Sequence, residues 1–148
     1  MGKHLAPQEV VNLIDKNADL IIPIANGEPI RLLDILEENA EQLDGVKIHQ
    51  MLALRSRSYI QGEIEQLKHV SYFLSGATRK VYQQAKIDLV PNNFHEVPRL
   101  LQKTTKMSMI MTVASPMDEH GYFTLGTQAD YIAEFIGKVP FLLEVNKN

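Results

Sequence analysis

Short apolar runs alternate with amphipathic stretches along most of this chain, and this alternation limits the folds that it can adopt. The runs at 20–25, 107–114 and 139–145 are rich in Leu, Ile, Val and Met, as in strands that are buried on both faces. Strands that alternate with helices pair in parallel, because each helix returns the chain to the same end of the sheet. The sequence therefore predicts an α/β fold, a mostly parallel sheet with helices on both faces.

The expected elements follow the chain in order. Strands are predicted at 20–25, 46–52, 69–74, 87–90, 107–114 and 139–145. Helices are predicted at 6–18, from Pro29 to near Gly45, and at 77–85, 95–103 and 128–137. The stretch 53–68 has no readable periodicity. No fixed-period repeat or low-complexity linker divides the chain, so residues 1–148 are treated as one domain.

Composition excludes several classes of function. The chain has 148 residues, of which 45% are hydrophobic and 22% charged, as in an ordinary soluble domain. A net charge of -3 without any cluster of Lys and Arg argues against nucleic-acid binding. The absence of cysteine excludes disulfides and thiol nucleophiles, and fits a reducing compartment. No apolar run is long enough to cross a membrane, and we expect a cytoplasmic protein.

Ligands of parallel sheets bind where strands turn into helices, at the carboxyl edge. Four predicted loops meet there: 26–28, 75–76, 92–94 and 115–127. Their glycines allow close approach of a ligand, and helix starts offer free N–H groups to an anion. The same loops also have the composition of simple connections, and that alternative stays open.

Other polar motifs each have a plainer alternative. The triplet 118–120, Asp-Glu-His, precedes Gly121 and is typical of a turn, although it also suggests a metal or an acid–base pair. The histidines have no zinc-binding spacing. The basic pairs Arg55/Arg57 and Arg79/Lys80 fit either phosphate contacts or solvated surface. The GxSxG, GxGxxG and GxxxxGK[ST] signatures are missing, so the residues alone predict a loop-built site of unknown chemistry.

Three stretches at these loops carry a family resemblance. They are NGEP at 26–29, SYFLSGATRKVYQQAKIDLVPNNFHEVPRLL at 71–101, and ASPMDEHGYFTLGTQADY at 114–131. In this order they resemble the acetyl-CoA hydrolase/CoA-transferase family, of the acetate, butyrate or 4-hydroxybutyrate CoA-transferase type. The resemblance spans the chain from about Gly27 onward and implies the amino-terminal half of a CoA-transferase-like fold.

The resemblance also implies a reaction. Family members move coenzyme A from an acyl-CoA to a short carboxylic acid such as acetate, or hydrolyse acetyl-CoA. A glutamate attacks the thioester and passes through a glutamyl-CoA intermediate. That glutamate lies in a second α/β half, which nothing in residues 1–148 matches. We therefore expect an amino-terminal domain without a catalytic residue of its own, inactive in isolation, and no metal or redox cofactor.

The implied acyl-CoA cleft is lined by three loops. The substrate-binding residues expected from the resemblance are Asn26, Gly27, Glu28, Asn93, Phe94, Ser115, Gly126 and Thr127. A short strand at 122–125 is expected to lay Gly126 against the site.

The expected partners are an acyl-CoA, a short carboxylic acid, the carboxy-terminal half of the same enzyme and further copies in a homo-oligomer, with no nucleic acid or membrane. Two alternatives stay open. One is a sugar-phosphate isomerase or deaminase of similar topology, and the other is a non-catalytic acyl-CoA-binding or assembly module.

Overall fold

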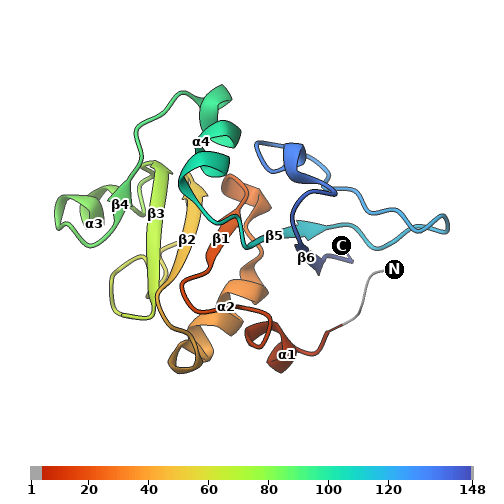
Figure 1. Ribbon diagram of the computed structural model, residues 1–148, viewed down its shortest axis with the longest axis horizontal. Helices are drawn as coiled ribbons and strands as arrows, with labels where there is room; N and C mark the ends of the chain where they lie inside the picture. Colours follow the sequence, from red (N-terminus) through yellow and green to blue (C-terminus); the bar gives the residue numbers. More distant parts are fainter. Residues whose placement is uncertain (1–4, 148) are drawn as a thin grey trace.

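Every pair of neighbouring strands in the sheet is parallel (Figure 1). The structure, a computed structural model, describes residues 5–147, and within them six strands form one sheet in the order β4-β3-β2-β1-β5-β6. The strands are β1 (Asp19–Ile22), β2 (Val46–Met51), β3 (Leu67–Phe73), β4 (Asp88–Leu89), β5 (Met109–Ala114) and β6 (Phe141–Val145). The predicted parallel sheet is confirmed.

Strand β1 explains why the apolar runs are nearly continuous. All four of its residues are buried, because it lies between β2 and β5 and both of its faces are covered. Leu20 and Ile22 belong to one apolar cluster, and Ile21 belongs to the cluster on the other face. Adjacent side chains of a strand point to opposite faces, so the run supplies two cores at once.

Helices cover both faces of the sheet, as predicted. They are α1 (Pro7–Val11), α2 (Ile30–Glu38), α3 (Arg79–Gln83) and α4 (Val97–Thr104), with the 3₁₀ turns η1 (Ala25–Gly27), η2 (Ala40–Gln42), η3 (Phe94–Glu96) and η4 (Ala133–Phe135). Figure 1 shows α1 and α2 on one side of the sheet and α4 on the other. The side chains of α1, α2 and α3 enter the first cluster, whereas those of α4 and η4 enter the second.

Helix α2 depends on a distant strand for its start. The residue before it is Pro29, and no side chain of the helix itself caps the free N–H groups of the first turn. Instead, the carboxylate of Glu144 in β6 accepts a hydrogen bond from the N–H of Leu32 at 3.0 Å. A negative charge at this end also interacts favourably with the positive end of the helix dipole. The edge strand and the first long helix therefore stabilise each other.

Two predicted elements are wrong. The helix expected at 128–137 is absent apart from η4. The hydroxyl of Tyr131 binds the carbonyl of Ile22 in β1, and the carboxylate of Asp130 accepts the N–H of Ile132, so both side chains hold the backbone in a non-helical path. The strand expected at 122–125 is also absent. Its place is taken by an irregular return that makes a backbone bond from Ser115 to Thr124, at 2.9 Å.

Candidate functional site

The strand order reverses between β1 and β5. From β1 the chain proceeds through β2 and β3 to β4 on one side, then crosses to place β5 and β6 on the other. In open parallel sheets such a reversal separates the loops that follow the two strands and leaves a crevice between them. The loops after β1 and β5 are therefore the first place to look for a site. They contain six of the eight predicted residues: Asn26, Gly27, Glu28, Ser115, Gly126 and Thr127.

The loop after β1 folds into the tight turn η1. Asn26 is exposed at its tip, whereas Gly27 is buried beneath it. A Cβ added to Gly27 would lie 2.7 Å from Cγ of Pro23 and 3.1 Å from Cβ of Gln128. The N–H of Gly27 donates to the carbonyl of Ile24. Glycine is needed here for packing between two loops, in addition to any role toward a ligand.

Residues 128–131 connect the two loops. One carboxylate oxygen of Asp130 accepts a hydrogen bond from the N–H of Ile24 at 2.7 Å. The hydroxyl of Tyr131 donates to the carbonyl of Ile22 and accepts the N–H of Met51 at 3.3 Å. The ends of β1 and β2 are thus fixed by a segment more than 75 residues away. Burial raises the pKa of Asp130, although the two N–H groups that it accepts lower it in part.

The loop after β5 forms a groove and an extended arm. The groove has a volume of about 240 Å³, and its lining residues are Val113, Ala114, Ser115, Pro116, Thr124, Leu125, Gly126, Asn146 and Lys147. Two predicted residues, Ser115 and Gly126, therefore share one groove. Gly126 has a φ of 59° and no heavy atom within 4 Å of the position of its missing Cβ, so its surface is open to a ligand. Thr127 is exposed beside it.

The third predicted loop reaches the same edge through an aromatic contact. The ring of Phe94 lies edge-on to that of Tyr131, with centroids 6.4 Å apart, and 55% of the Phe94 side chain stays exposed. Asn93 is exposed, and its side-chain amide donates to the carboxylate of Glu96, so its side chain does not cap the helical turn that follows. The neighbouring Asn92 donates to the carbonyl of Tyr72 and fixes the loop to β3.

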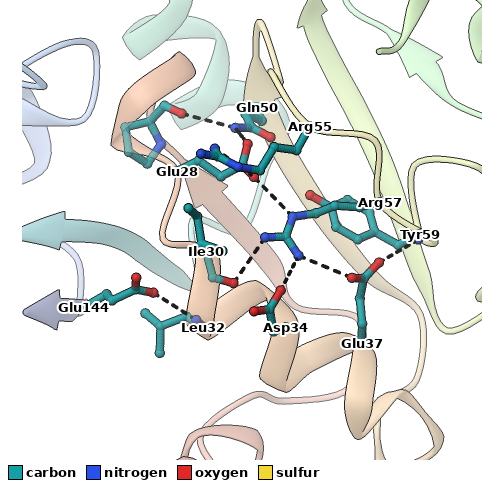
Figure 2. Close-up of polar contacts among 11 residues, drawn as sticks. Glu28, Ile30, Leu32, Asp34, Glu37, Gln50, Arg55, Arg57, Tyr59 and Glu144 are labelled. Atoms are coloured by element: carbon teal, nitrogen blue, oxygen red, sulfur yellow. Dashed lines mark hydrogen bonds and ion pairs between the residues drawn. The ribbon is translucent and has the colours of Figure 1, made fainter. Parts of the chain in front are cut away.

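Glu28 points away from the surface, into a buried polar network (Figure 2). Its carboxylate accepts hydrogen bonds from Nε of Arg57 at 3.1 Å and from the amide of Gln50 at 3.2 Å. The same guanidinium donates to Asp34 at 2.9 Å, to Glu37 at 3.3 Å and to the carbonyl of Ile30 at 3.1 Å. We call these contacts the Arg57 network. It fixes the loop after β1 to α2 and to the stretch after β2.

Both sequence interpretations of Arg57 are wrong. The side chain is neither solvated nor available to a phosphate, because it is only 5% exposed and its donors are used internally. Burial opposes its charge, but the hydrogen bonds to Asp34 and Glu28 outweigh burial and raise the pKa of Arg57. Arg55 differs, since it is 46% exposed and lies 3.9 Å from Glu28. The buried charge of Arg57 requires the carboxylate and carbonyl partners that it has here.

A second buried polar group lies at the other end of β1. Nε2 of His49 is 3.0 Å from Asp19, and its Nδ1 is 3.2 Å from the hydroxyl of Tyr72. Burial lowers the pKa of His49, against the raising effect of Asp19. Because Asp19 is the first residue of β1, this group is separate from the loops at the carboxyl edge.

The remaining motifs behave as connections. Asp118 to Gly121 form the predicted turn, with the N–H of Gly121 bonded to the carbonyl of Asp118 at 3.1 Å. Among residues 5–147, no group of three or more His, Asp or Glu side chains is arranged to hold a metal ion. Over the same residues, no helix has the length and apolar character needed to span a bilayer.

Sequence reasoning missed the residues that assemble this edge. Asp130 and Tyr131 fell within a predicted helix, and Arg57 within a stretch without pattern. Their partners lie 20 or more residues away, so no local spacing identifies them. For Asp130 and Tyr131, the one available signal was that the stretch 114–131, which contains both, resembles the family.

Comparison with known proteins assigns this architecture. Residues 2–147 match the model of the acetyl-CoA hydrolase/transferase N-terminal domain. The chain is 36% identical over 136 residues to the succinyl-CoA:cyclohexane-1-carboxylate CoA transferase of Geobacter metallireducens, covering 92% of this chain and 31% of that protein. It is 28% identical to the 4-hydroxybutyrate coenzyme A transferase of Clostridium kluyveri, covering 99% of this chain and 35% of that protein.

A solved structure agrees with these matches. RipA from Yersinia pestis superposes with a TM-score of 0.83 at 27% identity, over 97% of this chain and 36% of that one. The present chain thus spans about a third of the length of the relatives that it matches. The strand order is reversed between β1 and β5, nearly all residues match the family model, and the fold superposes on a solved relative. We conclude that the chain belongs to the acetyl-CoA hydrolase/transferase family and corresponds to its N-terminal domain.

Proposed function

We propose that this chain forms one wall of the site at which an enzyme transfers coenzyme A from an acyl-CoA to a short carboxylic acid such as acetate. The observation that carries the proposal is the pair of loops after β1 and β5, held together by Asp130 and Tyr131 in a domain of this family. Both relatives are named as CoA transferases. We assign to substrate contact the exposed positions at this edge, which are Asn26, Asn93, Phe94, Gly126 and Thr127, together with Ser115 in the groove.

The proposed reaction proceeds by acyl transfer through a glutamate that we place outside residues 1–148. Its carboxylate attacks the thioester carbonyl, which releases the coenzyme A thiolate and leaves an acyl-glutamyl anhydride. The thiolate then attacks the glutamyl carbonyl, giving a glutamyl-CoA thioester and the first acid. The acceptor carboxylate reverses these two steps and leaves with coenzyme A. Covalent catalysis of this kind needs no metal or redox cofactor.

Within this scheme, residues of the present chain bind and orient. The open face of Gly126 accommodates the thioester end of the acyl-CoA in the groove that it shares with Ser115, and Thr127, Asn26, Asn93 and Phe94 are proposed as further substrate contacts. Gly27 and Glu28 act from behind, by packing and through the Arg57 network. The enzyme is further proposed to act in the cytoplasm as a homo-oligomer with its carboxy-terminal half present, and the 148-residue chain alone is proposed to be inactive.

The first test is the intact mass of the natural gene product, followed by an exchange assay on the same material. A protein much larger than 16.8 kDa that forms acetyl-CoA from acetate and a second acyl-CoA supports the proposal. Release of free coenzyme A without exchange would make water the acceptor and the enzyme a hydrolase. A 16.8 kDa product without either activity would contradict the proposal and favour a binding module.

A matched pair of variants tests the groove. Gly126→Asn keeps a residue type that tolerates positive φ and adds a side chain to the open face. We expect kcat/KM for acyl-CoA to fall by about tenfold or more, which corresponds to roughly 1.4 kcal/mol or more. Gly137→Asn is the control, since Gly137 also has a positive φ, open surroundings and no place in the groove. Equal kinetics for the two variants would remove Gly126 from the site.

A further inference from the structure

Residues 115–126, which we call the arm, continue from β5 and extend away from the sheet (Figure 1). Although the arm is not a strand, its backbone is ordered by internal hydrogen bonds. The N–H of Ser115 donates to the carbonyl of Thr124 at 2.9 Å, and the N–H of Asp118 donates to that of Tyr122, also at 2.9 Å. These two hydrogen bonds hold the outgoing and returning halves of the arm side by side.

Side chains close the tip of the arm. One carboxylate oxygen of Asp118 accepts the N–H groups of His120 and Tyr122, at 2.9 and 2.8 Å. At the base, the hydroxyl of Ser115 accepts the N–H of Thr124 at 3.0 Å. The arm is therefore built before any partner binds, and a partner that docks on it has little backbone ordering to overcome.

The same arm exposes large apolar side chains. The exposed fractions are 56% for Met117, 71% for Tyr122 and 40% for Phe123. Three large apolar side chains within seven residues are therefore exposed, wholly or in part, on a backbone that internal hydrogen bonds hold in place. Exposed large apolar side chains that gather on one segment mark an interaction site more often than single scattered ones do.

The edge strand beside the arm is also unpaired on one side. Pro140 and Asn146 make backbone hydrogen bonds to β5. Because the N–H and C=O groups of successive residues in a strand point to opposite sides, those of Phe141, Leu143 and Val145 point away from β5. Among the described residues no strand pairs with this outer edge. Its charged side chain, Glu144, is bound to Leu32 of α2 and does not shield the edge. Open edges of this kind pair readily with another strand.

We propose that the arm and the outer edge of β6 dock the part of the full-length enzyme that lies beyond residue 148. The proposal rests on the proposed function and names the surface used by the missing part. It is supported by the length of the relatives, since about two-thirds of their chains lie outside the match. Because the arm also carries Ser115 and Gly126 of the groove, docking here places the second part against the proposed site.

The test uses the natural full-length protein with a photo-crosslinking residue, p-benzoylphenylalanine, in place of Tyr122. The control carries the same residue at Tyr82, which is 41% exposed on α3. Isotopically labelled and unlabelled protein are mixed before irradiation, and crosslinked peptides are identified by mass spectrometry. We expect position 122 to crosslink to peptides beyond residue 148 of the same polypeptide, and position 82 not to do so.

Other outcomes overturn the proposal. Crosslinks between labelled and unlabelled copies that fall within residues 5–147 would assign the arm to a second copy instead. A yield at position 122 no higher than that at Tyr82, or a natural product that ends at residue 148, would leave the surface without its proposed occupant. The exchange assay on unmodified protein stands apart from these results: a protein that crosslinks as expected but shows no exchange would contradict the proposed function and not the docking surface.

Discussion

The carboxylate of Asp130 accepts a hydrogen bond from the backbone N–H of Ile24 at 2.7 Å, although 106 residues separate them in the sequence. The bond holds the loop after β1 against the loop after β5. A buried N–H that loses its acceptor retains the cost of its desolvation. The position of the loop that carries Asn26 and Gly27 is therefore coupled to one side chain.

Asp130→Ala should loosen that loop and destabilise the chain. It removes the acceptor of Ile24 and of Ile132, so we expect a loss of about 1–3 kcal/mol in the free energy of unfolding. Urea unfolding measures the loss, and amide hydrogen exchange at Ile24 should become faster. Asp130→Asn, which keeps one acceptor oxygen, should lose less. Unchanged exchange at Ile24 in the alanine variant would mean that the bond does not hold the loop.

Arg57→Met should be more damaging than any change at the surface. It leaves the carboxylate of Glu28, only 1% exposed, without its ion pair at 3.1 Å and with only the half-exposed Arg55 at 3.9 Å, and we expect a loss of about 3–5 kcal/mol in urea unfolding. The double variant Arg57→Met/Glu28→Gln should recover part of this loss, because the orphaned charge is removed. Arg55→Met is the control and should change stability by about 0.5 kcal/mol or less, since Arg55 is 46% exposed.

Stability should fall in mild acid because of His69. Burial, with a contribution from His49, lowers the pKa of His69 to about 4, whereas an unfolded histidine titrates near pH 6.5. Between these values the unfolded chain binds more protons, so the free energy of unfolding decreases as the pH falls from 6.5 to 4, by roughly 3 kcal/mol from this group. His69→Leu should flatten a plot of stability against pH over that window. His120→Leu, at an exposed position, is the control. A His69→Leu profile identical to that of the unsubstituted protein would contradict the assignment.

Gly27→Ala should destabilise the chain through crowding alone. The new Cβ would meet the ring of Pro23 at 2.7 Å and the Cβ of Gln128 at 3.1 Å. Overpacking of this kind costs about 1–3 kcal/mol, which thermal or urea unfolding resolves. Gly76→Ala provides the comparison, because its Cβ would meet no atom within 4 Å. Similar stabilities for the two variants would show that the two loops separate freely.

The sheet was predictable because its signal is local. β1 and β5 appear as mostly apolar runs, and β2 and β3 as stretches in which apolar residues are mixed with polar ones. The loops were found for the same reason, since they lie between recognisable runs. The order of the strands does not follow from these runs, because the return of β5 to the side of β1 is a tertiary choice that no local pattern records.

The failures were at residues whose partners are distant. Tyr131, Ile132 and Phe135 have the spacing of a helix face, yet the bonds of Tyr131 to Ile22 and Met51 replace the helix. Tertiary contacts routinely override so short a periodic signal. The buried position of Arg57 had no signal either, since a polar stretch around an arginine is usually solvated.

The position of β1 between β2 and β5 has a consequence for synthesis on the ribosome. Of the six strands in residues 5–147, β1 emerges before the others, and β2 can pair with it soon afterwards, but β5, its other neighbour, follows only after β4 and α4 have been translated. During that interval one edge of a strand whose residues are all buried in the finished fold stays open in the nascent chain. Contacts between parts so far apart in sequence also form slowly. Translation that pauses after β4 should therefore lengthen the time during which the unfinished polypeptide aggregates or needs a chaperone.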